Sequence, residues 1–161
     1  MHSDASMEEI HRDPGHLSGD TPELAVAAYM TKAPHLVDSH APLPDALKVM
    51  RAHGIRHLPV TQAGALVGIL SKHDVILMTP LASAPPAEVS VEDVMSDDPY
   101  TVSPATPLGE VVQVMAERGV GAAIVVEGEA IVGVFTTIDA LRALAAVLDG
   151  RRQAREHGEA V

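Results

Sequence analysis

Two short segments of this chain each carry a hydroxyl residue three positions before an aspartate. The first pair is Ser71 and Asp74, and the second is Thr136 and Asp139, where Thr137 adds another hydroxyl. Both pairs follow a glycine and two apolar residues, a pattern that predicts the end of a strand running into a helix. The start of a helix presents unpaired N–H groups and partial positive charge, which favour a phosphate, and a carboxylate suits the hydroxyls of a ribose. The two pairs are therefore candidate nucleotide-binding residues.

The same spacing also fits a structural role, the helix capping box. In a capping box the hydroxyl accepts a hydrogen bond from the backbone of the residue three positions later, and the acid at that position accepts one from the backbone of the hydroxyl residue. For a single segment this role is the simpler interpretation, because it requires no ligand. The duplication of the segment favours a binding site, and both interpretations stay open at this point.

The two segments are parts of a longer repeat. Met30 aligns with Met95 and Asp74 aligns with Asp139, a constant spacing of 65 residues without a gap. Prolines, valines and glycines recur at matching positions between these limits. Such self-similarity indicates that one supersecondary unit occurs twice and that the two copies pack together.

Each unit is predicted to contain an extended segment, a helix, two strands and a second helix. Pro42 suits the first turn of the first helix, and Gly54 supplies a left-handed residue at its end. The apolar residues between them recur at helical spacing, whereas the strands contain β-branched residues around a short turn. The expected elements of the first unit are the extended segment 30–37, a helix over 42–54, strands over 55–61 and 65–70, and a helix that begins at residue 71.

The second unit repeats this order. Its strands are predicted over 120–126 and 130–135, and its closing helix over 138–148, ending at Gly150. Arg142 is the one charged residue in the apolar run of this helix, so most of its circumference needs a partner. In a protein of this size the additional partner is expected to be a second subunit, which predicts a homodimer.

The chain therefore divides into two units, a linker and two tails. Each unit is expected to open with a short helical lead-in, over 23–29 in the first and 91–95 in the second. The predicted boundaries are 1–22 for a disordered acidic tail, 23–79 for the first unit, 80–90 for the linker, 91–149 for the second unit and 150–161 for a charged C-terminal tail.

The composition narrows the class of protein. Of the 161 residues 47% are hydrophobic, which is enough for a core, but no run of 18 apolar residues and no signal peptide is present. A cytoplasmic location is therefore expected. The chain has no cysteine, and the histidines of its first 22 residues are scattered, so neither disulfides nor a metal site is predicted.

The net charge of −11 argues against binding to nucleic acid or to an anionic membrane surface. Both of these partners are bound chiefly through clustered lysine and arginine. Binding of single-stranded nucleic acid also requires aromatic rings, and only 2% of the residues are aromatic.

The ordered set of motifs resembles the tandem cystathionine-β-synthase (CBS) domain family, also called the Bateman module. The likeness covers roughly residues 24 to 148. It depends on the Met-Thr-x-x-Pro motif at Met30 and its Met-Ser-x-x-Pro counterpart at Met95, on the run Gly-Ile-Arg-His-Leu-Pro-Val at 54–60, and on the two hydroxyl-x-x-aspartate segments. The resemblance implies an α/β (α+β) fold of two β-α-β-β-α units related by pseudo-two-fold symmetry.

The resemblance also implies two clefts that bind adenosine-containing ligands. Carried over to this sequence, Asp74 and Asp139 would bind ribose hydroxyls, and the neighbouring hydroxyl residues would face phosphate. The adenine would lie against aliphatic residues of each unit. The residues implied are Ser71, Val37, Ile55 and Pro59 with Asp74 in the first unit, and Thr136, Thr137, Val102 and Val120 with Asp139 in the second.

The two units differ where this family often has basic phosphate ligands. The first unit has Arg56 and His57, whereas the second has Gly121 and Ala122. We therefore expect one competent site, built around Asp74, and a second site that is weak, empty or selective for a less charged ligand. Alternatively, Arg56 is a solvated residue at the end of a strand and His57 forms a structural hydrogen bond or a subunit contact.

The expected function is that of a non-catalytic sensor. The ligand would be AMP, ADP, ATP or S-adenosylmethionine, no cofactor would be required, and the signal would pass to a separate, unknown protein target. The alternative is a structural or protein-interaction dimer of the same fold with no physiological nucleotide. Enzyme activity is not expected, because no nucleophile, base and orienting group are predicted to converge in one cleft.

Overall fold

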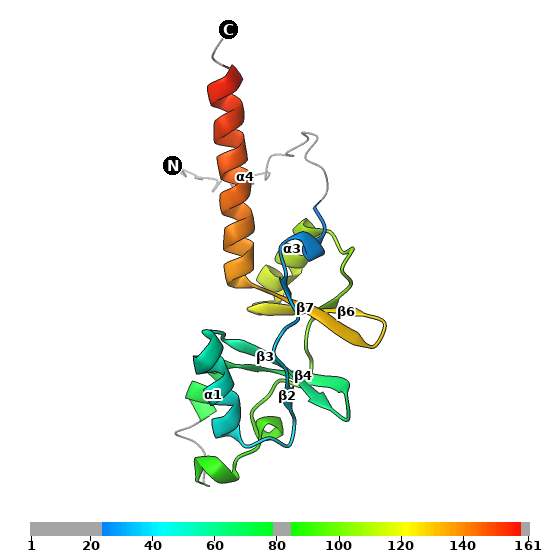
Figure 1. Cartoon of the computed structure of the whole chain (residues 1–161), viewed down its shortest axis with the longest axis vertical. Helices are drawn as coiled ribbons and strands as arrows, with labels where there is room; N and C mark the ends of the chain where they lie inside the picture. Colours follow the sequence, from blue (N-terminus) through cyan, green and yellow to red (C-terminus); the bar gives the residue numbers. More distant parts are fainter. Residues whose placement is uncertain (1–23, 79–84, 159–161) are drawn as a thin grey trace, which may run out of the picture.

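The computed structural model describes residues 24–78 and 85–158, with side chains described as far as residue 150. The predicted tail 1–22, the first part of the predicted linker and the last three residues lie outside this described part. The described chain forms two α+β units, which Figure 1 shows stacked one above the other. The helix labelled α4 extends away from the body of the upper unit.

The first unit contains a three-stranded sheet in the order β2-β3-β4. Strand β2 runs parallel to β3, and β3 and β4 form an antiparallel hairpin. Its elements are β2 (Val37–Asp38), α1 (Leu43–His53), β3 (His57–Gln62), β4 (Ala65–Ser71) and α2 (Lys72–Met78).

Helix α1 forms where the sequence predicts it. Leu43, Ala46 and Met50 are buried and recur at helical spacing, so the helix covers the core with one apolar face. Gly54 ends the helix with a φ angle of 61°, a left-handed conformation that glycine adopts without a steric penalty. The helix and its glycine cap are confirmed.

The second unit contains a four-stranded sheet in the order β1-β7-β6-β5. Its hairpin and its parallel strand repeat the arrangement of the first unit. Its elements are β1 (Thr31–Lys32), β5 (Thr101–Val102), α3 (Leu108–Arg118), β6 (Ala122–Glu127), β7 (Ala130–Thr136) and α4 (Thr137–Gly158).

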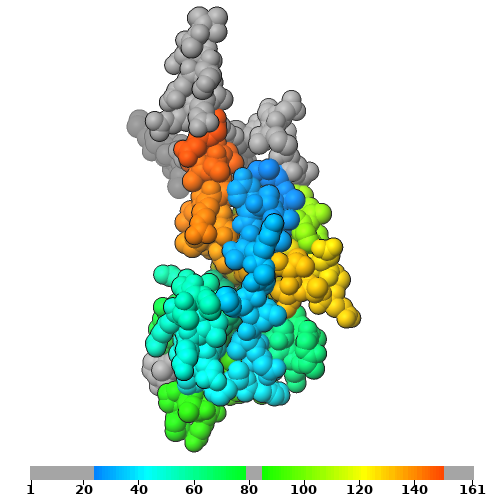
Figure 2. Space-filling view, viewed as in Figure 1, coloured from blue at the N-terminus to red at the C-terminus, as the bar shows by residue number. Residues whose placement is uncertain are grey.

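Strand β1 precedes the first unit in sequence, but it belongs to the sheet of the second unit. Thr31 lies opposite Val134 in antiparallel pairing with β7. The preceding turn η1 (Val26–Ala28) also packs against the second unit. Its residue Val26 is fully buried in the core of that unit. Figure 2 shows this segment in blue, running along the surface from the second unit towards the first.

In the same way, the segment that precedes the second unit in the sequence packs against the first unit. Turn η4 (Val91–Asp93) buries Val91 in the core of the first unit, and Ser96 bridges to Ile69 in β4. The turn η3 (Pro86–Glu88) also lies against α1 of the first unit. Each unit therefore completes its core with the lead-in of the other, which ties the two repeats into one folded body.

Two predicted helices have different extents in the structure. The lead-ins expected over 23–29 and 91–95 are single 3-10 turns, because the chain must then extend to reach the opposite sheet. The closing helix does not end at Gly150 but continues to Gly158. One glycine within a helix costs only about 1 kcal/mol relative to alanine, so the helix-forming residues after it sustain the helix.

Two hydrophobic clusters form the core, one in each unit. Met50, Leu58 and Leu70 are among the fully buried residues of the first, and Phe135 is the largest buried side chain of the second. In the part of the chain that the structure describes, no helix is long and apolar enough to cross a membrane.

Candidate functional site

A cavity of about 670 Å³ lies between the two units. Three segments line it: residues 31–35 on the way from β1 to β2, residues 53–57 between α1 and β3, and positions within 134–142 at the junction of β7 and α4. The first segment reaches the cavity because β1 pairs with β7, and the second because the first unit's sheet faces the second unit's. The site is thus built jointly by both repeats.

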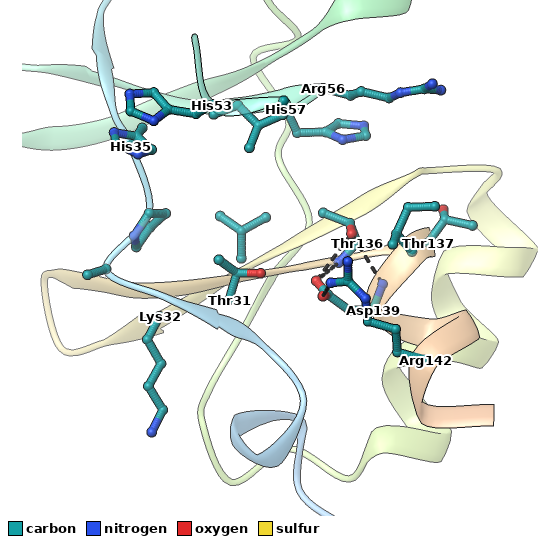
Figure 3. Close-up of a pocket in the computed structure, with 16 residues that line it drawn as sticks. Thr31, Lys32, His35, His53, Arg56, His57, Thr136, Thr137, Asp139 and Arg142 are labelled. Carbon is teal, nitrogen blue, oxygen red and sulfur yellow. Dashed lines mark hydrogen bonds and ion pairs between the residues drawn. The ribbon is translucent and has the colours of Figure 1, made fainter. Parts of the chain in front are cut away.

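On one side of the cavity, Thr136 and Asp139 form a complete capping box at the start of α4. The Thr136 backbone N–H and side-chain hydroxyl donate to Asp139 Oδ2 at 2.9 and 3.1 Å, and the Asp139 N–H donates to Thr136 Oγ1 at 3.4 Å. The Asp139 side chain is 5% exposed, and its other oxygen, Oδ1, lies 3.5 Å from Nη1 of Arg142. Figure 3 shows these groups together below the cavity.

Asp74 has a less developed cap in the corresponding place. The Asp74 N–H donates to Ser71 Oγ at 3.0 Å, which is one half of a capping box. Asp74 is half-buried, whereas Asp139 is buried. The structural role that the sequence left open is therefore present at both pairs and is fully developed at Asp139.

The other side of the cavity carries basic and imidazole side chains of the first unit. The rings of His35 and His53 stack with their centroids 3.7 Å apart and an angle of 19° between their planes. Arg56 and His57 follow at the start of β3, as Figure 3 shows. Lys32 also lines the cavity, although its side chain extends away from the histidines in this view.

His57 lies at the contact between the two units. Its Nε2 atom lies 3.1 Å from the position of a Cβ atom placed on Gly121. Burial lowers the pKa of His57, an effect that the charge of Asp74 opposes and the charge of Arg56 reinforces. The ring is therefore mainly neutral at pH 7, with one nitrogen free to accept a hydrogen bond.

The structure brings six of the residues predicted for the sites into this one cavity and leaves six outside. The six in the cavity wall are Ile55, Arg56, His57, Thr136, Thr137 and Asp139. Those outside its wall are Val37, Pro59 and Val102, which are buried, Val120, which packs against the second core, and Ser71 and Asp74 at the start of α2.

Arg56 and His57 have neighbours from both repeats. Within their own repeat, His57 pairs with Ser71 across the β3–β4 hairpin, the Lys72 N–H donates to the Arg56 carbonyl oxygen at 2.8 Å, and the charge of Asp74 acts on His57. Arg56 and His57 also line the cavity with Asp139 of the other repeat, because the start of β3 faces the junction of β7 and α4. The sequence shows only which residues belong to the same repeat. It does not show which repeat supplies the opposite wall.

The other ten residues of the cavity wall were not among the predicted site residues, and the polar ones that matter most are His35, His53 and Arg142. His35 follows a recognised motif, but its contribution depends on the exchange of β1. Arg142 had a detectable signal, because it lies three residues after Asp139 and so on the same face of the helix. An isolated charge in an otherwise apolar helix marks such a position.

Comparison with known proteins gives matches along most of the chain. The model of the CBS-domain family matches residues 26–78 and 91–146. An A-adding tRNA nucleotidyltransferase from Aquifex aeolicus is 33% identical over 123 residues, which are 76% of this chain. The chain spans only 14% of the length of that enzyme.

Solved structures agree with the fold. A protein described as an acetoin utilization protein (AcuB) from Vibrio cholerae has a TM-score of 0.71 at 30% identity, covering 81% of this chain and 96% of that one. The CBS domain pair of protein MJ0100 has a TM-score of 0.70 at 26% identity, covering 78% and 98%. The MJ0100 pair was solved in complex with 5′-methylthioadenosine and S-adenosyl-L-methionine.

Proposed function

Because this chain belongs to the CBS-domain family and consists of a tandem pair of such domains, we propose that it is a non-catalytic regulatory module that binds an adenosine-containing ligand between its repeats. The ligand would shift the relative populations of two arrangements of the units, and a separate protein would read that change. The candidate ligands are AMP, ADP, ATP and S-adenosylmethionine.

The observation that carries this proposal is the composition of the cavity at the repeat interface. Its volume of about 670 Å³ lies within the usual range of small-molecule pockets, roughly 300–1,000 Å³. It combines an apolar residue, Ile55, with hydroxyls, a carboxylate and cationic groups. These are the groups that suit a base, a ribose and a phosphate respectively.

In the proposed complex, Asp139 accepts hydrogen bonds from the ribose hydroxyls. Thr136 and Thr137 face the phosphate from the start of α4, and Ile55 contacts the adenine. The bound adenosine derivatives of the MJ0100 domain pair support a ligand of this class. A second site around Asp74 and Ser71 is part of the same proposal, with Val37 and Pro59 of the first unit and Val102 and Val120 of the second kept as the remaining candidates for contact with adenine.

We also propose that the active form is a homodimer formed through α4. Leu141, Leu144 and Leu148 are each more than half exposed, and they recur along one stripe of this helix. Ile76 and Leu77 of α2 are exposed in the same way. Apolar surface of this extent is typical of a protein interface, and a second copy of the chain would cover it with the same residues.

One observation favours the alternative, a structural or protein-interaction dimer without a nucleotide. The Asp139 carboxylate is already bonded to Thr136 on one oxygen and close to Arg142 on the other. In that case the aspartate would serve only to cap α4, and the cavity would have no adenosine ligand.

Isothermal titration calorimetry with AMP, ADP, ATP and S-adenosylmethionine decides between these functions. We expect at least one compound to bind, and Asp139→Asn to weaken its binding at the cavity. Asp74→Asn, the matching change in the other repeat, is the control and should leave binding at that cavity unchanged. If none of the four compounds binds to the folded wild-type protein, the sensor proposal is wrong and the alternative stands.

A further inference from the structure

We propose that the cavity beside Asp139 selects a phosphate-bearing adenosine ligand over an uncharged or cationic one, and that Arg142 is the residue that sets this preference. This inference deepens the proposed function and depends on it. It concerns the charge class of the ligand, on which the candidates differ: AMP is an anion, adenosine is neutral, and S-adenosylmethionine carries a sulfonium cation.

The permanent charges of the cavity wall are mostly positive. Lys32, Arg56 and Arg142 line it, and Asp139 is the one carboxylate among its lining residues. This local excess of cations contrasts with the net charge of −11 of the whole chain. Asp74 lies outside the wall, but its charge acts on His57, so the three cations of the wall face two nearby carboxylates, Asp139 and Asp74. Exposed acids farther away are screened by salt beyond about 8 Å.

The equivalent positions of the other repeat lack these cations. At the 65-residue spacing, Lys32 corresponds to Asp97, Arg56 to Gly121, and Arg142 to Leu77. The excess of cations is therefore specific to the cavity beside Asp139. The duplication of the sequence does not produce it at the equivalent positions near Asp74.

Near Asp74, the positions equivalent to the cavity wall carry more acids than cations. The cations are Lys72 and Arg118, against three aspartates at equivalent positions, Asp74, Asp97 and Asp98. Arg118 is already engaged, because its Nη2 lies 3.2 Å from Asp98 Oδ2 and its guanidinium lies over the ring of Tyr100. This side offers little free positive charge for a phosphate.

Arg142 couples the ribose position to the phosphate position. Its guanidinium lies 3.5 Å from Asp139 Oδ1, and its side chain is 73% exposed. Figure 3 shows the side chain of Arg142 directed back towards Asp139. The Asp139 carboxylate is buried, but the arginine side chain is exposed, and 3.5 Å is longer than the usual length of a charge-assisted hydrogen bond, about 2.7–2.9 Å. The guanidinium can therefore be transferred to another anion.

This geometry gives different outcomes for charged and uncharged ligands. When a nucleotide binds, Asp139 turns from Arg142 to the ribose hydroxyls, and the released guanidinium takes the phosphate as its new anionic partner. A neutral adenosine separates Asp139 from Arg142 without offering a replacement. A sulfonium ligand, in addition, brings a positive charge next to the free guanidinium.

The test is calorimetric titration of AMP, adenosine and S-adenosylmethionine into the wild-type protein and the Arg142→Leu variant. Leucine is the residue that the other repeat carries at this position, as Leu77. We expect the wild type to bind AMP roughly tenfold more tightly than adenosine, a difference of about 1.4 kcal/mol. Arg142→Leu should remove most of this difference by weakening AMP roughly three- to tenfold while leaving adenosine unchanged or slightly improved.

Arg51→Leu is the charge-matched control, because Arg51 is exposed on α1 and does not line the cavity. It should leave the ratio of AMP to adenosine affinity unchanged, and circular dichroism should show both variants to be folded. Equal affinity of the wild type for AMP and adenosine, or an unchanged ratio in Arg142→Leu, would overturn this inference but leave the proposed function intact. Failure of all three compounds to bind would overturn this inference, and it would overturn the proposed function as well only if ADP and ATP also fail to bind.

Discussion

The imidazole of His57 in the first repeat lies against the backbone of Gly121 in the second, with Nε2 3.1 Å from where a Cβ atom of residue 121 would lie. In the aligned repeats the large pair Arg56 and His57 corresponds to the small pair Gly121 and Ala122. Small residues on one side therefore make room for large ones on the other. The difference between the repeats is thus a packing requirement as well as a difference in charge.

Gly121→Val should force the His57 ring out of its position. Overpacking of this kind typically costs about 1–3 kcal/mol of unfolding free energy, which urea denaturation would measure. His57→Ala removes the obstructing ring, so the double variant should recover most of the loss. If the losses of the two single variants simply add, the two residues are not in contact in solution.

Gly68→Ala should destabilise the exchange of the lead-in segments. A Cβ atom on Gly68 would lie 2.5 Å from the backbone carbonyl oxygen of Ser96, which also accepts a hydrogen bond from Ile69 N–H at 2.9 Å. Because a backbone atom cannot rotate away, we expect a loss of about 1–3 kcal/mol in unfolding free energy. Chemical denaturation followed by circular dichroism measures it.

Gly109→Ala provides the matched control for this prediction. Gly109 lies in α3, and a Cβ atom there meets nothing within 4 Å. Replacing it should stabilise the helix by about 0.5–1 kcal/mol. A Gly68→Ala variant that is as stable as Gly109→Ala would contradict the close approach of Ser96 to β4.

Asp139→Asn should lower the unfolding free energy more than Asp74→Asn. The Asp139 carboxylate accepts two hydrogen bonds from Thr136 and lies close to Arg142 while nearly excluded from water. Hydrogen bonds to a charged group contribute roughly 1.5–3 kcal/mol, and the more exposed cap at Asp74 about 1 kcal/mol or less. Thermal unfolding of the two variants in ligand-free buffer compares them, and equal losses would contradict the structural difference between the caps.

The stability of the protein should depend on pH through His57. Burial lowers its pKa in the folded state, so below about pH 6.5, the ordinary histidine value, the unfolded chain takes up a proton before the folded one does. The unfolding free energy therefore falls as the pH drops from about 6.5 towards the lowered pKa, and then this contribution levels off.

The variant His57→Gln isolates this contribution from that of the other histidines. The difference in unfolding free energy between wild type and variant should shrink as the pH falls below about 6.5. Urea denaturation at several pH values from 7.5 to about 5 measures this difference. A difference that stays constant over the range would show that His57 has the same pKa in both states.

Leu144→Glu should weaken the proposed dimer. Leu144 is 54% exposed on α4, between Leu141 and Leu148 on the same helix, and a carboxylate there would be buried without a partner in the interface. Sedimentation equilibrium should show a shift towards monomer. Leu36→Glu is the control, because Leu36 is also exposed but lies outside α4; a loss of dimer in both variants, or in neither, would contradict an interface on this helix.

The sequence alone determined most of the local structure. The burial pattern of α1 and its end at Gly54 follow from residue spacing and from the backbone freedom of glycine. The cap formed by Thr136 and Asp139 likewise depends on residues only three positions apart. The constant spacing of 65 residues between the copies identified the duplicated unit. All of these features depend on neighbours in the chain, so the order of residues is sufficient to predict them.

The tertiary structure alone decided which residues share the cavity. A duplicated sequence is compatible with walls from one repeat or with walls from both, because equivalent residues have the same local pattern in either arrangement. The choice depends on contacts between distant segments, such as Thr31 with Val134 and His57 with Gly121. Those contacts place Arg56 and His57 opposite Asp139. No local pattern carries that information, because it arises from how two folded surfaces fit together.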